Sequence, residues 1–324
     1  MSPSQNRSPH MLPSLRLGLT AVEIRPIGVG TWQWGDGRLW EFDPRLGPRK
    51  AKEAFHASLD AGITFFDTAE IYGGGKSERI LGALTDLSAR EAFVATKFAP
   101  LPYRLTSTTM TKALDRSLQR LRAERVDLYQ VHWPWTLLSM SSLMERLADA
   151  VDEGKTRFVG VSNYNAKQMV AAHRELAARG VPLVSNQVHY SLLNRDPESN
   201  GVLETCRGLG ITLIAYSPLE QGALSGGYRP GGRSPSGLRR FRGVFRHLAR
   251  AMPVVEELEA IATVHGRSPS QVALNWLARQ PGVLPIPGAK DGQQAAENAR
   301  SIDFVIDESE AERLNRVSGA FARG

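Results

Sequence analysis

The sequence predicts an α/β protein whose fold class is a (β/α)8 TIM barrel. Short β-branched or apolar segments alternate with amphipathic segments of helical spacing, and the alternation occurs eight times along the chain. The apolar segments are almost uninterrupted, as expected of parallel strands that are buried on both faces. The length of 324 residues suits one large barrel or two ordinary domains. No linker-like segment divides the chain, which favours one barrel.

Each expected strand is followed by a segment with the character of a helix. In Thr106–Arg122, for example, Met110, Leu114, Leu118 and Leu121 recur at helical spacing with basic residues between them. In chain order, the expected strands are Pro26–Gly30, Ile63–Asp67, Ala92–Lys97, Val126–His132, Thr156–Ser162, Leu183–Gln187, Ile211–Ser217 and Val283–Pro287.

Three features lie outside the repeated units. Leu15–Leu19 and Val22–Ile24 precede the first strand and are expected to form a hairpin that caps the barrel floor. Gln221–Met252 is rich in glycine, proline and arginine and is expected to be a long loop after the seventh strand. Loops of that length usually have a function or lack order. Asp307–Val317 is expected to be an additional helix that opens with acidic residues.

Composition indicates a folded chain that stays outside membranes. The apolar share is 42% and the charged share is 23%, and no apolar run reaches the roughly 18 residues of a membrane span. The single cysteine, Cys206, permits no internal disulfide, so we expect a cytoplasmic protein in which Cys206 is a packing residue. Residues 1–14 lack the apolar core of a secretory signal. We expect them to be a flexible tail rather than a short transit peptide, with residues 15–324 as a single domain.

Positive charge is concentrated in one segment of the chain. The net charge is +7, and between Glu220 and Glu256 there is no acidic residue. The arginines of this segment are Arg229, Arg233, Arg239, Arg240, Arg242, Arg246 and Arg250. We expect no nucleic-acid partner, because aromatic residues are few there and no helix–turn–helix or zinc-finger spacing accompanies them. A phosphate-bearing small molecule fits the segment better, and a solvated loop without a ligand is the alternative.

Four polar residues stand at or just after the ends of successive expected strands. Asp67 and Tyr72 lie in FFDTAEIYGGG, Lys97 lies in FVATKF, and His132 lies in VDLYQVHWP. The carboxyl ends of barrel strands meet at one face of the barrel, and this face holds the active site. The four side chains would combine an acid, a cation that tunes it, a carboxylate that holds the cation, and an imidazole that binds a carbonyl oxygen.

Tyr72 is the expected general acid of a carbonyl-reducing site. A tyrosine has an ordinary pKa of about 10, and a nearby Lys97 ammonium would lower the pKa of Tyr72 by stabilising the phenolate. Asp67 would pair with Lys97, and His132 would donate a hydrogen bond to the same carbonyl oxygen. Each residue also has a structural interpretation, as a helix cap, a solvated strand end or a packing residue. Only their joint placement favours catalysis.

These motifs resemble those of the aldo-keto reductase family. The pair Asp67 and Tyr72, Lys97 in ATKF, and His132 in LYQVHWP match that family's catalytic tetrad one for one. Among its subgroups the chain is most similar to plant-chloroplast and cyanobacterial reductases of unassigned substrate, through IGVGTWQWGD, ATKFAPLP and SNQVHYSLL. The resemblance extends from the hairpin to Asn298. It implies NADPH as cofactor, a small-molecule carbonyl substrate reduced to an alcohol, no metal ion, and a monomer.

The resemblance also implies that NADPH lies extended across the top of the barrel. A Rossmann site is not expected, because Gly28–Gly30 is followed by no third glycine in phase. Ser162, Asn163 and Gln187 match residues that hold the nicotinamide carboxamide, with helix capping as the alternative for the first two. Tyr216 matches the aromatic side chain that stacks on the nicotinamide. The remaining matches are Gly30, Thr31, Trp32 and Asp67 near the nicotinamide, and Ser217, Leu219 and Gly222 around the pyrophosphate.

The adenosine end departs from the family's usual pattern. Lys290 is expected to face the 2′-phosphate. The residues expected to address the adenine, all on the following helix, are Gln294, Glu297 and Asn298. Many family members have a Lys-Ser pair where this chain has Gly288–Ala289, and many have an arginine at the position of Gln294. We hypothesise that the neighbourhood of Arg239 and Arg240 supplies the missing phosphate contacts.

Tryptophans after the first and fourth expected strands suit an apolar substrate wall. We expect Trp34 and Trp133 to line the substrate pocket, with ordinary packing as the alternative for each. Tyr103 and Arg104, after the third strand, are expected near its border. An arginine there would favour an acidic or phosphorylated carbonyl compound.

Three other functions are compatible with parts of the sequence. An NADPH-binding regulatory or redox-sensing protein, like the β subunits of voltage-gated potassium channels, would have the same fold, since fold does not determine function. An aldolase that forms a Schiff base on Lys97 would need no nicotinamide. The segment Gly73–Ser77 resembles a P-loop, but that motif requires a glycine where Glu70 stands. The intact tetrad favours the reductase over all three.

Overall fold

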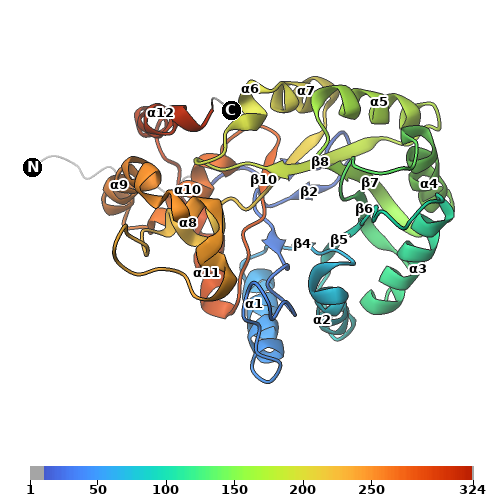
Figure 1. The fold of residues 1–324 in the computed structure, drawn as a ribbon, viewed down its shortest axis with the longest axis horizontal. Helices are drawn as coiled ribbons and strands as arrows, with labels where there is room; N and C mark the ends of the chain where they lie inside the picture. Colours follow the sequence, from blue (N-terminus) through green and yellow to red (C-terminus); the bar gives the residue numbers. More distant parts are fainter. Residues whose placement is uncertain (1–10, 323–324) are drawn as a thin grey trace, which may run out of the picture.

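The expected barrel is present in the computed structural model, which describes residues 11–322 (Figure 1). Eight parallel strands pair in chain order. The first and last strands are joined by a parallel bridge between Gly30 and Gly288, and the Gly28 N–H donates to the Pro285 carbonyl over 2.9 Å. These contacts close the barrel. The strands are β3 (Val29–Gly30), β4 (Phe65–Asp67), β5 (Phe93–Phe98), β6 (Val126–Val131), β7 (Thr156–Ser162), β8 (Leu183–His189), β9 (Thr212–Tyr216) and β10 (Val283–Pro285).

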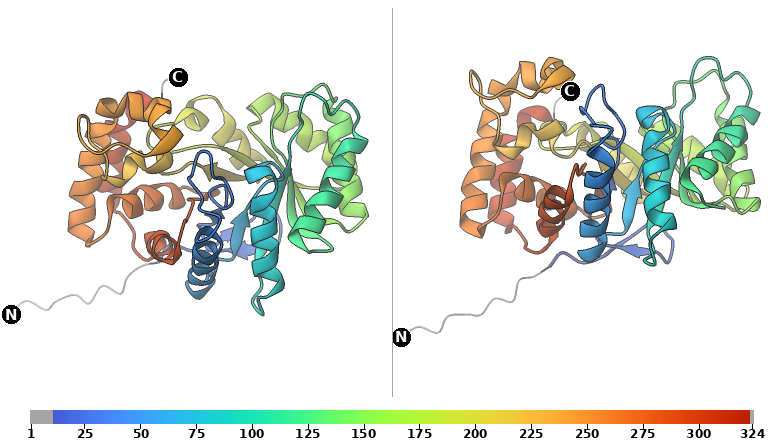
Figure 2. Two further views of the ribbon diagram at one scale, coloured as in Figure 1. Left: turned by 60° about the horizontal axis from the view of Figure 1, so that its bottom comes forward. Right: turned by 90° about the horizontal axis from the view of Figure 1, so that it is seen from below.

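Helices lie around the outside of the strands and connect each strand to the next (Figure 1, Figure 2). Helix α3 buries Met110, Leu114, Leu118 and Leu121, as their spacing predicts. The helices are α1 (Gly47–Asp60), α2 (Lys76–Asp86), α3 (Thr108–Leu121), α4 (Met140–Asp152), α5 (Ala166–Ala177), α6 (Asp196–Ser199), α7 (Val202–Leu209), α8 (Gly243–Arg246), α9 (Leu248–His265), α10 (Pro269–Ala278), α11 (Gly292–Ala299) and α12 (Glu308–Val317).

The observed strands differ from the expected ones mainly at their ends, where the backbone hydrogen bonds between neighbouring strands start or stop. β3 starts later than expected, because Pro26 has no N–H to donate and the Ile27 N–H bonds within its own turn. β8 continues past the expected end at Gln187 to His189, since His189 pairs with Tyr216 of β9. The whole of β7 is as expected.

The expected hairpin closes the floor of the barrel. The buried Leu17 and Ile24 join the side chains of the barrel interior in one apolar cluster. The Gly18 N–H donates to Thr212 Oγ1 over 2.8 Å. Gly18 has φ +55°, and a Cβ there would stand 3.0 Å from the Val184 backbone, so the turn requires glycine. The strands of the hairpin are β1 (Leu15–Arg16) and β2 (Glu23–Ile24).

The chain already packs on the barrel before residue 14, where the N-terminal tail is expected to end. Leu12 is buried, and its N–H donates to the Ile302 carbonyl over 3.0 Å. The domain therefore includes Leu12. The rest of the expected tail, residues 1–10, lies outside the described part of the chain.

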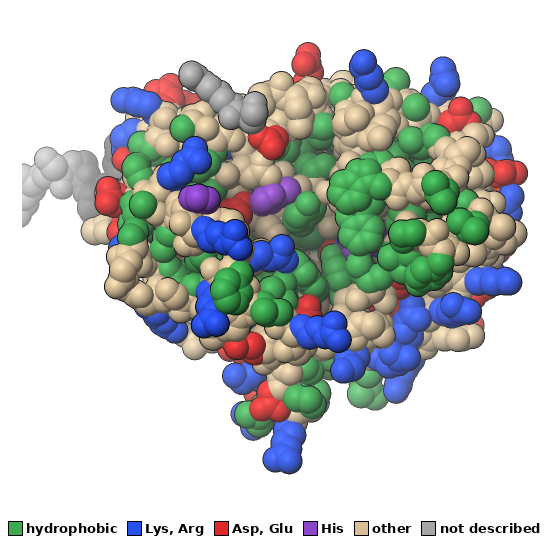
Figure 3. All heavy atoms as spheres, in the orientation of Figure 1, with side chains coloured by type: hydrophobic (Ala, Val, Ile, Leu, Met, Phe, Trp, Pro, Cys, Tyr) green, Lys and Arg blue, Asp and Glu red, His purple; other side chains and the backbone are tan. Residues whose placement is uncertain are grey.

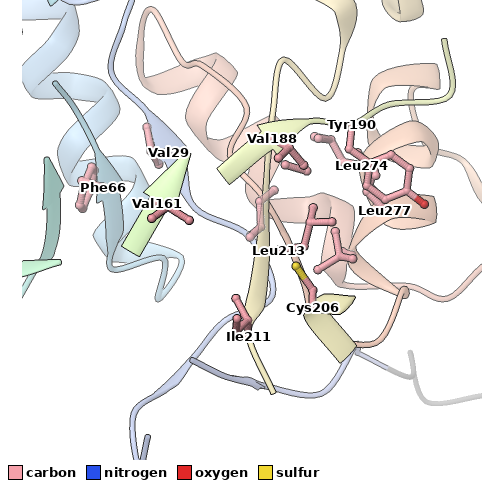
Figure 4. Close-up of a cluster of buried hydrophobic side chains, with 14 of the residues drawn as sticks. Val29, Phe66, Val161, Val188, Tyr190, Cys206, Ile211, Leu213, Leu274 and Leu277 are labelled. Carbon is pink, nitrogen blue, oxygen red and sulfur yellow. The ribbon is translucent and has the colours of Figure 1, made fainter. Parts of the chain in front are cut away.

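The apolar core has two layers, one inside the barrel and one between the strands and the helices. Figure 4 shows part of the outer layer, where Cys206 lies among side chains that include Ile211, Leu213 and Leu277. Burial raises the pKa of the Cys206 thiol to about 12, which keeps the thiol protonated. Cys206 is a packing residue, as expected.

The segment after β9 is more ordered than the sequence predicts. The loop does not extend to Met252, because α9 already begins at Leu248, where Leu248 and Ala251 pack against Ala223. Two short 3-10 helices precede it, η2 (Glu220–Ser225) and η3 (Gly237–Phe241). Lys, Arg and His side chains gather on the face of the molecule that carries α8 (Figure 3).

The last helix begins as the sequence predicts. Asp307 caps α12 by accepting a hydrogen bond from the Glu310 N–H over 2.8 Å, and the Glu310 side chain accepts one from the Asp307 N–H in return. Between residues 11 and 322, no helix is both long enough and apolar enough to cross a membrane.

Candidate active site

The four tetrad residues meet at the carboxyl ends of three neighbouring strands. Asp67 is the last residue of β4, Lys97 lies in β5, His132 follows β6, and Tyr72 begins the 3-10 helix η1 (Tyr72–Gly74). Parallel pairing of β4 with β5 and of β5 with β6 brings these positions to one face. A cavity of about 780 Å³ opens there, and Asp67, Tyr72 and His132 line it.

Lys97 is the centre of the tetrad's hydrogen bonds. Its ammonium donates to Asp67 Oδ1 over 2.5 Å, to the Thr68 carbonyl over 2.8 Å and to the Tyr72 hydroxyl oxygen over 3.4 Å. The Lys97 side chain is 0% exposed. Burial lowers the pKa of Lys97, and the Asp67 carboxylate opposes that change.

Asp67 remains available to Lys97 because other groups satisfy its second oxygen. Asp67 Oδ2 accepts hydrogen bonds from Gln187 Nε2 over 2.8 Å and from Gln130 Nε2 over 3.4 Å. A buried ion pair is tolerated when further hydrogen bonds satisfy both partners. The predicted pairing of Asp67 with Lys97 is therefore present, and Gln187 belongs to the same network.

The expected lowering of the Tyr72 pKa is wrong for this structure. Burial of the hydroxyl, and then the Asp67 carboxylate, raise the pKa of Tyr72 well above its ordinary value. The Lys97 ammonium does not reverse this rise in pKa, because it lies closer to the Asp67 carboxylate than to the Tyr72 hydroxyl. The Tyr72 phenol consequently stays protonated at neutral pH.

His132 is held as a neutral imidazole beside Tyr72. Burial, and then the charge of Lys97, lower the pKa of His132 well below its ordinary value. The His132 ring stacks on Trp133 with centroids 3.9 Å apart, and it meets the Tyr72 ring edge-on at 5.9 Å. Its Nδ1 is buried and has no partner within the described residues. A neutral imidazole has one N–H to donate.

A chain of hydrogen-bonded amide and hydroxyl groups continues from His132 along the cavity wall. The Asn163 amide donates to the His132 carbonyl over 3.0 Å and to Ser162 Oγ over 3.1 Å. The Tyr216 hydroxyl donates to Asn163 Oδ1 over 3.0 Å, and the Ser162 hydroxyl donates to the Gln187 carbonyl over 2.8 Å. These four predicted cofactor residues all line the cavity.

The far end of the cavity is cationic. Lys290 lies with its ammonium 5.7 Å from the Trp40 ring centroid, and the Arg239 guanidinium lies 5.3 Å from the same ring. Burial, and then the charge of Arg239, lower the pKa of Lys290. Arg239 is only 9% exposed and lines the cavity, whereas Arg240 is exposed and stacks on Phe241.

The residues that match a known family span nearly the whole barrel. Residues 26–318 match the family model described as "Aldo/keto reductase family". The chain belongs to this family. A relative named "Pyridoxal reductase, chloroplastic", from Arabidopsis thaliana, is 36% identical over 94% of this chain and 86% of its own length. The "6-dehydroglucose reductase" of Novosphingobium aromaticivorans is 34% identical over 89% of each chain.

Solved structures of other aldo-keto reductases have the same fold. The Klebsiella pneumoniae aldo-keto reductase in complex with NADPH is 28% identical, with a TM-score of 0.77, over 95% of this chain and 96% of its own. The glycerol dehydrogenase of Gluconobacter oxydans is 26% identical, with a TM-score of 0.82, over 96% of each chain. The TIM barrel and the family predicted from the sequence are both confirmed.

Two predicted site residues of this aldo-keto reductase point away from the cavity. Trp34 is 1% exposed, packs against Phe66 and donates from Nε1 to the Ala289 carbonyl over 2.8 Å, so it is not a substrate-pocket residue. Thr31 is buried, and its hydroxyl bonds to the Asp67 carbonyl over 2.9 Å and to Ser77 Oγ over 2.8 Å. With its N–H also bonded to Asp67, Thr31 has no free group for a cofactor.

Tyr103 and Arg104, expected near the border of the substrate pocket, do not line the cavity. Arg104 instead donates to both carboxylate oxygens of Glu70, and Tyr103 is exposed.

Most of the other predicted residues do line the cavity. Lys97 does not line the cavity, but its ammonium lies 3.4 Å from the Tyr72 hydroxyl oxygen. Trp133, the second predicted pocket residue, is in the wall, where it stacks on His132. Trp32 is also in the wall and stacks on Tyr72 with centroids 6.0 Å apart. The remaining predicted residues in the wall are Gly30, Ser217, Leu219, Gly222, Gln294, Glu297 and Asn298.

Several wall residues were not predicted from the sequence. The loop after β3 contributes Gln33 and Asp36. The segment after β9 contributes Gln221, Tyr228, Arg233 and Ser236, and α10 contributes Ser270. The arginine-rich composition marks the second segment as a whole, but no pattern distinguishes Arg233 from its exposed neighbours. Their place in the wall depends on contacts between distant segments, such as the Ser236 hydroxyl donating to Glu41 Oε2 over 2.5 Å.

Proposed function

We propose that this protein is an NADPH-dependent oxidoreductase that reduces aldehydes or ketones to alcohols. The observation that carries the proposal is the buried group of Asp67, Lys97 and Tyr72 with neutral His132, which opens into one cavity whose far end holds Arg239 and Lys290. The complex of the Klebsiella pneumoniae relative with NADPH supports the choice of cofactor.

The cavity wall fits an extended dinucleotide. The buried side-chain oxygens of Gln33 and Gln221, both in the wall, have no hydrogen-bond partner within the described residues. Ser162, Asn163 and Gln187 would hold the carboxamide end. Lys290 and Arg239, with the polar side chains of α11, would hold the phosphate-bearing adenosine end. The remaining residues of this assignment are Gly30, Trp32, Asp67, Tyr216, Ser217, Leu219, Gly222, Gln294, Glu297 and Asn298.

In the proposed reaction the cofactor supplies a hydride, and this chain's residues supply the proton and the orientation. Tyr72, protonated at neutral pH, donates its proton to the carbonyl oxygen as general acid. The Lys97 ammonium, 3.4 Å from the Tyr72 oxygen, then stabilises the phenolate that forms. Neutral His132 donates its N–H to the same carbonyl oxygen. Asp67 keeps Lys97 in place.

We propose a flat aromatic aldehyde, such as pyridoxal, as the first substrate to test. Trp32 and Trp133 present aromatic rings to the cavity beside Tyr72 and His132, and aromatic rings favour stacked partners. The name of the Arabidopsis thaliana relative points to the same class of substrate. The sugar-reducing relative makes a sugar carbonyl the natural comparison compound.

The test is NADPH oxidation with a panel of aldehydes and ketones by wild type and by Tyr72→Phe. Removal of a general acid should lower kcat by roughly 10²–10⁴-fold, while the Kd for NADPH changes less than about twofold, since only the hydroxyl is lost. Tyr103→Phe is the matched control, because Tyr103 is 73% exposed; it should have wild-type kcat.

Equal rates for wild type and Tyr72→Phe would refute the mechanism. Tight NADPH binding by wild type without turnover of any carbonyl compound would instead support the alternative, an NADPH-binding regulatory or redox-sensing protein with this fold. A monomeric state, a cytoplasmic location and the absence of nucleic-acid binding stay predictions.

A further inference from the structure

The turn after β9 has an unusual backbone for residues other than glycine. Ser217, Glu220 and Gln221 have φ values of +51°, +49° and +56°, and Gly222 follows with φ +101°. Side chains disfavour this left-handed region, and residues stay in it only when their surroundings hold them. Ser217, Gln221 and Gly222 all line the cavity. The group that holds this turn therefore shapes the cavity wall.

Glu220 anchors the turn from behind. Its side chain is only 9% exposed, and Oε1 accepts hydrogen bonds from His189 Nε2 over 2.5 Å and from Ser191 Oγ over 2.6 Å. Ser191 is itself fully buried, and its hydroxyl oxygen accepts the Leu193 N–H over 3.1 Å. Both donors come from the end of β8 and the residues after it, so Glu220 fastens the turn to the neighbouring strand.

The same contacts extend to the tetrad. The His189 ring stacks on the Tyr216 ring, with centroids 5.4 Å apart and planes 9° apart. The Tyr216 hydroxyl donates to Asn163, whose amide donates to the His132 carbonyl. A continuous set of contacts therefore joins Glu220 to His132 along one wall of the cavity.

We propose that Glu220 is a positioning residue that sets the affinity for NADPH. It holds the left-handed turn against the cavity and, through His189, fixes the plane of the Tyr216 ring. Glu220 does not itself line the cavity, so its effect acts through the turn and through His189. The inference rests on the proposed binding of NADPH.

The test compares Glu220→Asn with Glu220→Gln in NADPH titrations monitored by fluorescence. Asparagine tolerates a left-handed backbone but is one carbon shorter, so it cannot reach His189 and Ser191. We expect Glu220→Asn to raise the Kd for NADPH about tenfold, which corresponds to about 1.4 kcal/mol. Glutamine keeps the reach and the accepting oxygen, so Glu220→Gln should remain within about threefold of wild type.

The kinetics should separate positioning from general loss of structure. In Glu220→Asn, kcat/KM for NADPH should fall because the KM for NADPH rises. The KM for the carbonyl substrate at saturating NADPH should change less than about twofold. Ser191→Ala and His189→Phe are second variants that remove one donor each, and His189→Phe keeps the stack on Tyr216. Each should raise the Kd for NADPH about threefold.

The two hypotheses fail in different ways. If wild type binds no NADPH, the proposed function fails. If wild type binds NADPH and Glu220→Asn binds it equally well, Glu220 has no positioning role. Should Glu220→Asn not fold, unchanged NADPH binding by both Ser191→Ala and His189→Phe would overturn the inference, and weaker binding by them would support it.

Discussion

His132 shows how burial selects the protonation state of a single residue. Its ring lies between Tyr72 and Trp133, and the Lys97 charge is close enough to disfavour a second cation. Both effects lower the pKa of His132. The neutral ring can donate one hydrogen bond to a carbonyl oxygen without bringing another charge next to Lys97. Because the pKa of His132 is lower in the folded chain than in the unfolded chain, this residue also makes stability depend on pH.

We predict that acid destabilises the fold through His132. The pKa of His132 is well below the ordinary value of about 6.5 that it has in the unfolded chain. The unfolded chain therefore binds more protons below pH 6.5, and stability falls as the pH decreases through that range. When the pH is lowered from 6 to 5, the free energy of unfolding of wild type, measured with urea, should fall by about 1 kcal/mol more than that of His132→Gln.

The control for this experiment is the same pair of proteins at pH 7.5 and pH 8.5, where His132 is neutral in both the folded and the unfolded chain. Their stability difference should be constant there. Parallel stability curves for the two proteins down to pH 5 would show that His132 is not the titrating group.

At the scale of elements, the segment between β9 and α9 contacts the loop after β3 across the cavity. Ser236 donates to Glu41, and Arg239 lies over Trp40. The two segments are almost 200 positions apart in sequence. The Arg239 guanidinium and the Lys290 ammonium consequently lie 5.3 Å and 5.7 Å from the centroid of the same indole ring, and both side chains line the cavity.

We predict that Arg239, and not Arg240, contributes to the preference for NADPH over NADH. A hydrogen bond to a charged group contributes about 1.5–3 kcal/mol, so Arg239→Ala should weaken NADPH binding by roughly 10–100-fold and leave the Kd for NADH nearly unchanged. Lys290→Ala should act in the same direction. The measurement is the Kd of each variant for both cofactors.

Arg240→Ala is the matched control, since Arg240 is adjacent in sequence but exposed. Its NADPH/NADH ratio should equal that of wild type. An unchanged ratio in both Arg239→Ala and Lys290→Ala would show that neither cation binds the 2′-phosphate.

At the scale of the whole molecule, the proposed NADPH cavity draws residues from segments that are far apart along the chain. Wall residues extend from Gly30 in β3 to Asn298 in α11. A ligand that binds the closed barrel and not the unfolded chain stabilises the entire domain by mass action.

We predict that NADPH raises the Tm of the protein. At a free concentration of 100 times Kd the stabilisation is about 2.7 kcal/mol, which corresponds to a rise of about 4 °C for a chain of this size. NADH at the same concentration should give a smaller rise. The measurement is a thermal melt followed by circular dichroism, and a Tm that does not change with NADPH concentration would contradict the proposed cofactor.

Much of the fold was predictable because periodicity and strand ends are local properties of the chain. Eight apolar segments at regular intervals specify eight strands, and polar residues at their ends must share a face. The strand-end residues Asp67, Lys97 and His132, and Tyr72 just beyond β4, could therefore be placed together without a structure. The sequence did not reveal that the side chains of Trp34 and Thr31 point away from the cavity and into the protein interior, since no pattern distinguishes neighbouring positions in a loop.

The sequence by itself determined the barrel, the tetrad and the strand-end residues of the cavity, because each follows from spacing along the chain. Only the tertiary structure decided which arginines line the cavity, why the pKa of Tyr72 is raised, and what holds the turn at Glu220. Those properties depend on burial and on distances between segments far apart in sequence. Packing alone sets such distances, so they cannot be read from local patterns.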